Sequence, residues 1–187
     1  MPGFFVLSEG YEPAEPHAGQ LAIRSTVDSR QDDSGKVTMG AIYRLAMRQD
    51  ASRLYDIRRR SILELAPPAM PAAEAQAWAS QLTLSGMERK LRELEVWVAE
   101  LDGVVAGWGA IRGDMLEGLY AAPEFAGQGV GAGLLGMLEG LMRDRKFPSV
   151  RLEASSNARG FYLRRGYRPT GPQTSKGAWP MLKEHLA

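Results

Sequence analysis

Cysteine is absent from the 187-residue sequence. Its absence excludes disulfides, thiolate metal sites and a cysteine acyl-enzyme, and it is compatible with the reducing cytoplasm, where we expect the protein to reside. Histidine is almost as scarce, with only His17 and His185 near opposite ends of the chain. A Ser-His-acid triad or a histidine metal site would have to use one of these two residues. We therefore expect neither chemistry and no bound metal.

Long apolar segments are missing too. No run of 18 or more apolar residues occurs, so the sequence predicts no transmembrane helix and no membrane partner. The first residues lack a basic stretch followed by an apolar one, so we expect no secretory signal. The net charge of +1 gives no positive indication of a nucleic-acid partner, and none is expected.

The first 38 residues differ in composition from the rest of the chain. They mix Gly, Pro, Ser and acidic residues, without periodicity beyond residues 4–7, which is typical of disorder. Two interpretations stay open: residues 1–38 are a flexible arm, or translation begins at Met39. Residues 39–187 are long enough to bury one core, and we expect them to form a single domain.

Apolar periodicity and turn residues divide this domain into strands and helices. We expect strands at 41–46, 95–101, 104–111, 115–121, 149–154, 167–170 and 174–182. We expect helices at 51–65, 72–82, 129–145 and 158–165, with a polar helical turn at 86–93. The dipeptide Asp102-Gly103 predicts a two-residue hairpin. The element order favours an α/β fold with a mixed sheet.

A glycine-dense turn, with Gly127, Gly129 and Gly131, joins a predicted strand to the longest predicted helix. The unpaired N–H groups and the dipole of a helix start favour an anion, and glycine lets a ligand approach the backbone. We interpret the turn as a loop that holds a cofactor pyrophosphate. Two alternatives stay open. The glycines serve only to permit tight strand–helix packing, or Gly127-x-Gly129-x-x-Ala132 is a loose dinucleotide-binding fingerprint. A dinucleotide-binding fold needs several further βα units after this loop, and too few residues follow it here.

Two segments carry a family resemblance. The first reads Leu119-Tyr-Ala-Ala-Pro, followed by Ala126-Gly-Gln-Gly-Val-Gly. The second reads Leu152-Glu-Ala-Ser-Ser-Asn-Ala-Arg-Gly-Phe-Tyr-Leu-Arg-Arg-Gly-Tyr. In this order and spacing they resemble the GNAT superfamily of acyl-CoA-dependent N-acetyltransferases. One position departs from the family pattern, because Ala126 stands where Gln or Arg is usual and a side chain that assists phosphate binding is missing.

The resemblance implies the GNAT acyl-CoA N-acyltransferase fold, a central mixed sheet with splayed strands flanked by helices. It also implies acetyl-CoA as co-substrate, held largely by backbone atoms of Leu119, Tyr120, Ala121, Gly127, Gln128, Gly129, Val130, Gly131 and Ala132. Asn157 would hydrogen-bond the pantetheine arm or an ordered water. Its alternative role is the N-cap of the following helix.

The same resemblance places Tyr162 beside the thioester sulfur, where a phenol can protonate the departing thiolate. The alternative is an aromatic side chain that only packs on the sheet. Glu117 is the best-placed general base for the amine, directly or through water, and its spacing from Leu119 predicts that both lie on one sheet face. The alternative is an exposed strand carboxylate.

The implied activity is direct transfer of the acetyl group to an amine acceptor, a small molecule or a peptide, in a ternary complex. A non-catalytic CoA-binding module, a longer acyl group or a hydroxyl acceptor remain alternatives. In the family, helices such as those at 51–94 shape the acceptor pocket, which makes Trp78 a candidate contact. A homodimer is expected only by analogy with relatives that pair through the C-terminal region.

Overall fold

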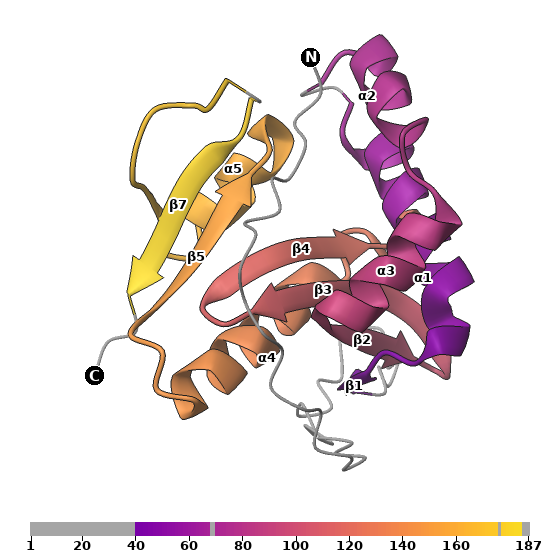
Figure 1. The fold of residues 1–187 in the computed structure, drawn as a ribbon, viewed down its shortest axis with the longest axis horizontal. Coiled ribbons are helices and arrows are strands. Elements are labelled where there is room, and N and C mark those ends of the chain that lie inside the picture. Colours follow the sequence, from indigo (N-terminus) through magenta and orange to yellow (C-terminus); the bar gives the residue numbers. More distant parts are fainter. Residues whose placement is uncertain (1–39, 68–69, 176, 185–187) are drawn as a thin grey trace, which may run out of the picture.

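The computed structural model describes residues 40–67, 70–175 and 177–184, so the expected boundary between residues 38 and 39 lies outside it. The strands form one mixed sheet in the order β1-β2-β3-β4-β5-β7-β6 (Figure 1). They are β1 (Ile42–Leu45), β2 (Glu95–Leu101), β3 (Val104–Arg112), β4 (Met115–Ala121), β5 (Ser149–Ala154), β6 (Arg168–Pro169) and β7 (Trp179–Glu184). The α/β architecture predicted from the element order is confirmed.

The helices are α1 (Ala51–Arg60), α2 (Ala72–Ala79), α3 (Leu84–Glu93), α4 (Val130–Asp144) and α5 (Ser156–Leu163). Helix α1 continues into a π-helical segment, η2 (Ser61–Leu65). The polar turn predicted at 86–93 is a full helix, because Thr83 caps its start by accepting a hydrogen bond from the Gly86 amide at 3.0 Å.

Strands β1 to β4 form an antiparallel meander. Between β2 and β3, Asp102 and Gly103 have φ angles of 50° and 75°. Positive φ at both central residues is the requirement of a type I′ turn, so the predicted hairpin is confirmed.

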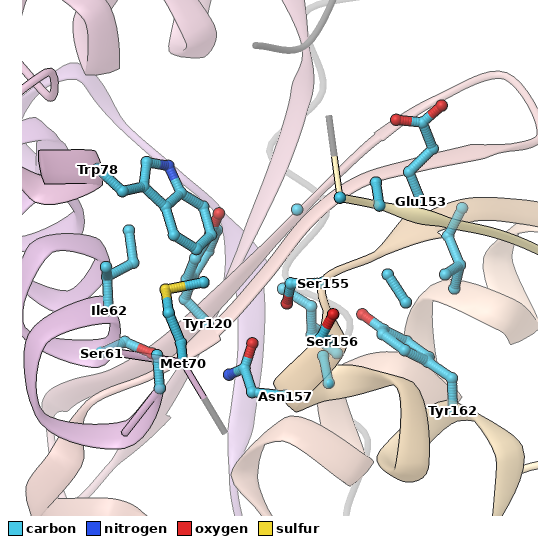
Figure 2. A pocket seen from close by; sticks show the side chains of 18 of the residues that line it. Ser61, Ile62, Met70, Trp78, Tyr120, Glu153, Ser155, Ser156, Asn157 and Tyr162 are labelled. Atoms are coloured by element: carbon cyan, nitrogen blue, oxygen red, sulfur yellow. The ribbon is translucent and has the colours of Figure 1, made fainter. Parts of the chain in front are cut away.

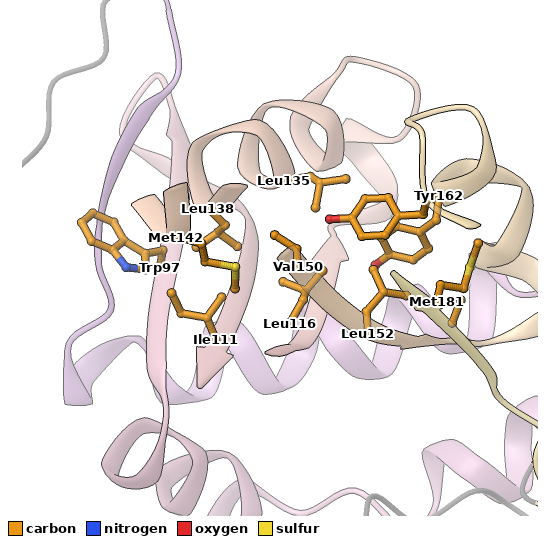
Figure 3. Packing of buried hydrophobic residues seen from close by; sticks show 12 residues of the cluster. Trp97, Ile111, Leu116, Leu135, Leu138, Met142, Val150, Leu152, Tyr162 and Met181 are labelled. Carbon is orange, nitrogen blue, oxygen red and sulfur yellow. The ribbon is translucent and has the colours of Figure 1, made fainter. Parts of the chain in front are cut away.

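Helices cover both faces of the sheet. On one face, α4 and α5 bury a cluster that includes Leu116, Leu135 and Tyr162 (Figure 3). On the other face, α1 and α3 bury a cluster around Trp108. Helix α4 comes close to β3 because Gly109 has no side chain: a Cβ there would lie 2.6 Å from a methyl of Leu138.

The end of the chain differs from the sequence-based prediction. The last strand begins at Trp179, five residues later than expected. Residues before it form a loop in which the Thr174 amide donates to Ala178 O at 2.8 Å and Gly177 has a φ of 79°. Local loop hydrogen bonds thus replace the ladder pairing expected from residue 174.

Candidate active site

Strands β4 and β5 separate soon after they meet. They pair in parallel at only two register positions, Met115↔Arg151 and Leu116↔Leu152, and their ribbons then diverge (Figure 1). A cavity of about 360 Å³ opens between them (Figure 2). Among the residues that line it are Glu117, Leu119, Tyr120, Asn157 and Tyr162. The fold therefore brings together five candidate residues from segments about 40 positions apart.

The glycine turn continues β4 toward α4, beyond the residues that line the cavity. Gly127 and Gly129 have φ angles of 78° and 85°, a conformation that glycine adopts without strain, and a Cβ at either would meet no atom within 4 Å. The first helical hydrogen bond of α4 runs from the Gly133 amide to Gly129 O at 2.8 Å. The amides of Val130, Gly131 and Ala132 come before this bond. In the first turn of a helix such amides have no acceptor within the helix, so they are free to bind a ligand.

Gln128 differs from its neighbours in the turn. Its amide donates to Phe125 O at 3.3 Å, and its side-chain Nε2 donates to Glu124 O at 3.0 Å. Both groups are engaged in holding the turn. Ala121, the remaining predicted contact, ends β4 and pairs with Gly107.

A β-bulge in β4 corrects the predicted orientation of Glu117. Leu116 pairs with Ile111 and Gly118 pairs with Ala110, so Glu117 is the extra residue. As a result, Leu116 and Leu119 both face α4, although they are three residues apart. Glu117 lies on the opposite face from Leu119, not on the same one.

The environment of Glu117 agrees with this placement. Its Oε1 lies 3.7 Å from Nε of Arg112, and its side chain is 17% exposed. Burial and the charge of Arg58 lower the pKa of Lys90 on α3, while the charge of Glu117 opposes them. Glu117 thus lines the cavity from the face that α3 covers, with Arg112 beside it and its charge felt by Lys90.

Tyr162 lines the cavity from the other face. It belongs to α5, is 7% exposed, and its ring packs edge-on against Phe161 and Tyr167. Burial, followed by the influence of Tyr120, raises the pKa of the Tyr162 hydroxyl far above its ordinary value. The phenol is therefore neutral and able to donate a proton at physiological pH.

The Tyr162 hydroxyl faces the cavity, on the side of Ser155 and Ser156 (Figure 2). Within the part of the chain that the structure describes, it has no hydrogen-bond partner. A nearly buried phenol without a partner, directed into a cavity, is suited to bind a ligand atom.

Asn157 is not the N-cap of α5. That position belongs to Ser155, and Asn157 is the second residue of the helix. Its side chain is exposed at the cavity wall beside Ser155 and Ser156 (Figure 2). The residue is thereby available to a ligand, which is the other of its two predicted roles.

A second wall of the cavity comes from the helices before β2. Ser61 and Ile62 of η2, Met70, and Trp78 of α2 line it opposite Asn157 (Figure 2). Of these, the sequence singled out only Trp78. The remaining residues are ordinary helix and loop residues, so no local signal distinguishes them.

An arginine lies near the glycine turn. The guanidinium of Arg165 stacks on the Phe161 ring, 3.7 Å from its centroid, and Nη1 donates to Phe161 O at 3.1 Å. The Phe161 ring in turn lies 3.9 Å from where a Cβ of Gly131 would be. Phe161 therefore lies between the Arg165 guanidinium and the first turn of α4.

The described residues hold neither a cluster of metal ligands nor a membrane-spanning helix. No group of three or more His, Cys, Asp or Glu side chains in those residues is arranged to hold a metal ion. None of the described helices is long and apolar enough to cross a membrane.

Comparison with known proteins matches the chain to one family model, described as an acetyltransferase (GNAT) domain, over residues 66–183. No curated protein matches the sequence. Among solved structures, a GCN5-related N-acetyltransferase from Rhodopseudomonas palustris is 25% identical with a TM-score of 0.72, covering 80% of this chain and 99% of that one.

Two further structures share the fold and contain ligands. The PaiA N-acetyltransferase of Thermoplasma acidophilum, in complex with coenzyme A, is 19% identical with a TM-score of 0.66, covering 79% of this chain and 100% of that one. The YncA putative acetyltransferase of Salmonella typhimurium, with acetyl-CoA, is 22% identical with a TM-score of 0.53, covering 79% and 97%.

Proposed function

This chain belongs to the GNAT acetyltransferase family, and on that premise we propose that it transfers the acetyl group of acetyl-CoA directly to an amine acceptor in a ternary complex. The observation that carries the proposal is the partnerless, neutral Tyr162 hydroxyl in the cavity between the diverging strands. A direct transfer also agrees with the lack of any cysteine to hold an acyl group.

The residues present fit acetyl-CoA. Open space at Gly127 and Gly129 leaves the turn accessible, and the amides of Val130, Gly131 and Ala132 would hold the pyrophosphate. The diverging edge of β4 at Leu119 to Ala121 would hold the pantetheine arm like an added strand, with Asn157 as a side-chain contact. Acetyl-CoA supplies an activated acetyl thioester.

Arg165 would compensate for the missing side chain at Ala126. A guanidinium has five N–H donors, and the contact with Phe161 O uses only one nitrogen. Arg165 stacks on Phe161, whose ring lies next to Gly131 in the first turn of α4. We infer that Arg165 contributes to cofactor affinity.

The two proposed catalytic residues act from opposite faces of the sheet. Glu117, or a water that it orders, would accept the proton of the amine, and Arg112 is ion-paired with its carboxylate. Tyr162 would donate the proton that the sulfur atom needs as it leaves. Both residues line the cavity between β4 and β5, where the reacting groups would meet.

The direct test is isothermal titration calorimetry with acetyl-CoA, followed by an assay of CoA release with a panel of amines. We infer that residues 39–187 are the transferase domain, so a chain that begins at Met39 is measured beside the full chain. Micromolar binding by both and amine-dependent CoA release are expected. Failure of both to bind would contradict the proposal, whereas binding by the full chain alone would move the domain boundary.

A further inference from the structure

Resting on the proposed function, we propose that the acceptor is a small diamine-like cation, whose second ammonium group is recognised by Glu153 and Glu74. The cavity is divided by the sheet into two sides with different chemistry. The side of Tyr162 and Asn157 matches the cofactor, and the side of Trp78 remains for the acceptor.

Strand register brings two carboxylates to the point where β4 and β5 diverge. Leu116↔Leu152 is the last pair, and both leucines are buried in the cluster beneath α4. The next residue in each strand is a glutamate, Glu117 and Glu153. Because neighbouring residues of a strand alternate in direction, both point to the face away from α4. Figure 2 shows the Glu153 carboxylate directed away from Tyr162.

A third carboxylate, Glu74 of α2, lines the cavity from the helical wall. In residues 40–67, 70–175 and 177–184, no Lys, Arg or His lines the cavity. Over the same ranges, the side chains of Glu74 and Glu153 make no hydrogen bond or ion pair. Their charges are therefore available to a bound cation, and a cleft lined by one sign of charge concentrates ligands of the opposite sign.

Two arginines that contact lining residues lie outside the lining. Arg112 is ion-paired with Glu117, and Arg58 lies over the Tyr120 ring, 5.5 Å from its centroid. An acceptor carboxylate would thus meet three acidic side chains in the lining and no compensating cation among its described residues. This juxtaposition disfavours amino acids and acidic peptides as acceptors.

The helical wall of the cavity is largely apolar. Ile62, Met70 and Trp78 present hydrocarbon and indole surface to the cavity (Figure 2). Such a surface suits the methylene spacer of a diamine, and an indole face also attracts a cation. The volume of about 360 Å³ is at the lower end for small-molecule sites, which favours a small acceptor. The partnerless Tyr162 hydroxyl lines the same cavity, on the side assigned to the cofactor.

The test compares three acceptors of equal chain length: 1,4-diaminobutane, n-butylamine and 4-aminobutanoate. They differ only in whether the far end is cationic, neutral or anionic. We expect kcat/KM for the diamine to exceed that for butylamine by about tenfold, and butylamine to exceed the amino acid, because a charge-assisted pair forms only with the diamine.

Variants then assign the preference to residues. Glu153→Gln and Glu74→Gln should each lower the ratio of the diamine to the butylamine value. The double variant should bring the ratio to about two, the statistical value for a molecule with two equivalent amines. The ratio cancels losses of folded protein, which lower both values alike. Glu184→Gln, at the other end of the β5–β7 pair and 63% exposed, is the matched control and should leave the ratio unchanged.

The outcomes separate this inference from the proposed function. Equal kcat/KM for the diamine and butylamine, or faster turnover of 4-aminobutanoate, would overturn the diamine inference and leave the transferase proposal standing. Binding of acetyl-CoA without turnover of any of the three amines would also overturn it. Failure of acetyl-CoA to bind would instead overturn the proposed function itself.

Discussion

Two tyrosines that contact each other differ in whether their hydroxyl groups are available to a ligand. Tyr162 and Tyr167 have ring centroids 5.4 Å apart, and burial raises the pKa of both hydroxyls. The Tyr167 hydroxyl donates to Glu139 Oε1 at 2.9 Å, whereas the Tyr162 hydroxyl faces the cavity. The Tyr167 hydroxyl has a hydrogen-bond partner within the fold, and of the two only the Tyr162 hydroxyl is available to a substrate.

Replacing Tyr162 by Phe should lower kcat by about a hundredfold, the usual contribution of a general acid, with little change in acetyl-CoA affinity. Steady-state kinetics and calorimetry measure the two quantities. Tyr167→Phe is the matched control: it should keep kcat and lose about 1 kcal/mol of unfolding free energy with its hydrogen bond. Equal kcat for Tyr162→Phe and the parent protein would remove Tyr162 from the acid role.

Replacing Arg165 by Gln should weaken CoA binding by about tenfold, because charge-assisted contacts to phosphate are lost. The effect should shrink as salt concentration rises, since added ions screen the charge. Calorimetry at low and high salt measures both. Arg164→Gln removes the adjacent, exposed arginine and should leave the dissociation constant unchanged; an equal loss in both variants would indicate a general charge effect.

At the scale of elements, the contact of α4 with the sheet depends on residues without side chains. Gly133 lies against the Tyr43 hydroxyl of β1, and a Cβ at that position would overlap Tyr43 Oη. Gly136 lies about one turn further along the same helix, and a Cβ there would meet no atom within 4 Å. The two glycines have the same helix propensity and opposite surroundings.

We therefore expect Gly133→Ala to lower the free energy of unfolding by about 2 kcal/mol through overpacking. Gly136→Ala should raise it by about 0.5–1 kcal/mol, because alanine favours the helix. Urea denaturation measures both. Adding Tyr43→Phe to Gly133→Ala removes the overlapping oxygen and should restore part of the loss; no restoration would mean that Gly133 matters for another reason.

At the scale of the whole molecule, carboxylates paired across elements tie stability to pH. Asp50, 8% exposed, accepts hydrogen bonds from Arg44 Nη1 at 2.7 Å, Arg44 Nη2 at 3.0 Å and the Met47 amide at 2.7 Å. Burial alone would raise the pKa of Asp50, but these donors together lower it. Arg145 and Arg151 likewise lower the pKa of Glu95 and Asp114.

A lowered pKa in the folded state means that the unfolded chain binds more protons in the acid range. This stability is fully present above the unfolded pKa values of about 4, and it is lost as pH falls through the lower folded values. Urea denaturation between pH 6 and pH 3 should show the decline. Asp50→Ala should lower unfolding free energy at pH 6 by about 2 kcal/mol and weaken the pH dependence. An unchanged dependence would mean that Asp50 does not contribute.

Much of the fold and of the cofactor region is determined by the sequence itself. The order of strands and helices, the Asp102-Gly103 turn and the glycine turn before α4 all depend on neighbouring residues, so local patterns predict them. Asn157 and Tyr162 were identified as candidates because each belongs to a short motif, and Glu117 because of its spacing from Leu119. The predicted start of β7 was wrong, because the strand is preceded by a loop whose own hydrogen bonds compete with pairing to the neighbouring strand.

Only the tertiary structure decided how these residues face one another. The bulge at Glu117 reverses its direction relative to Leu119, and parallel register with β5 brings Glu153 beside it at the divergence of the strands. The helical wall around Ile62 and Met70, and the burial that raises the pKa of Tyr162, likewise come from segments distant in sequence. Register, face and burial are properties of pairs of segments, and a pattern within one segment does not contain them.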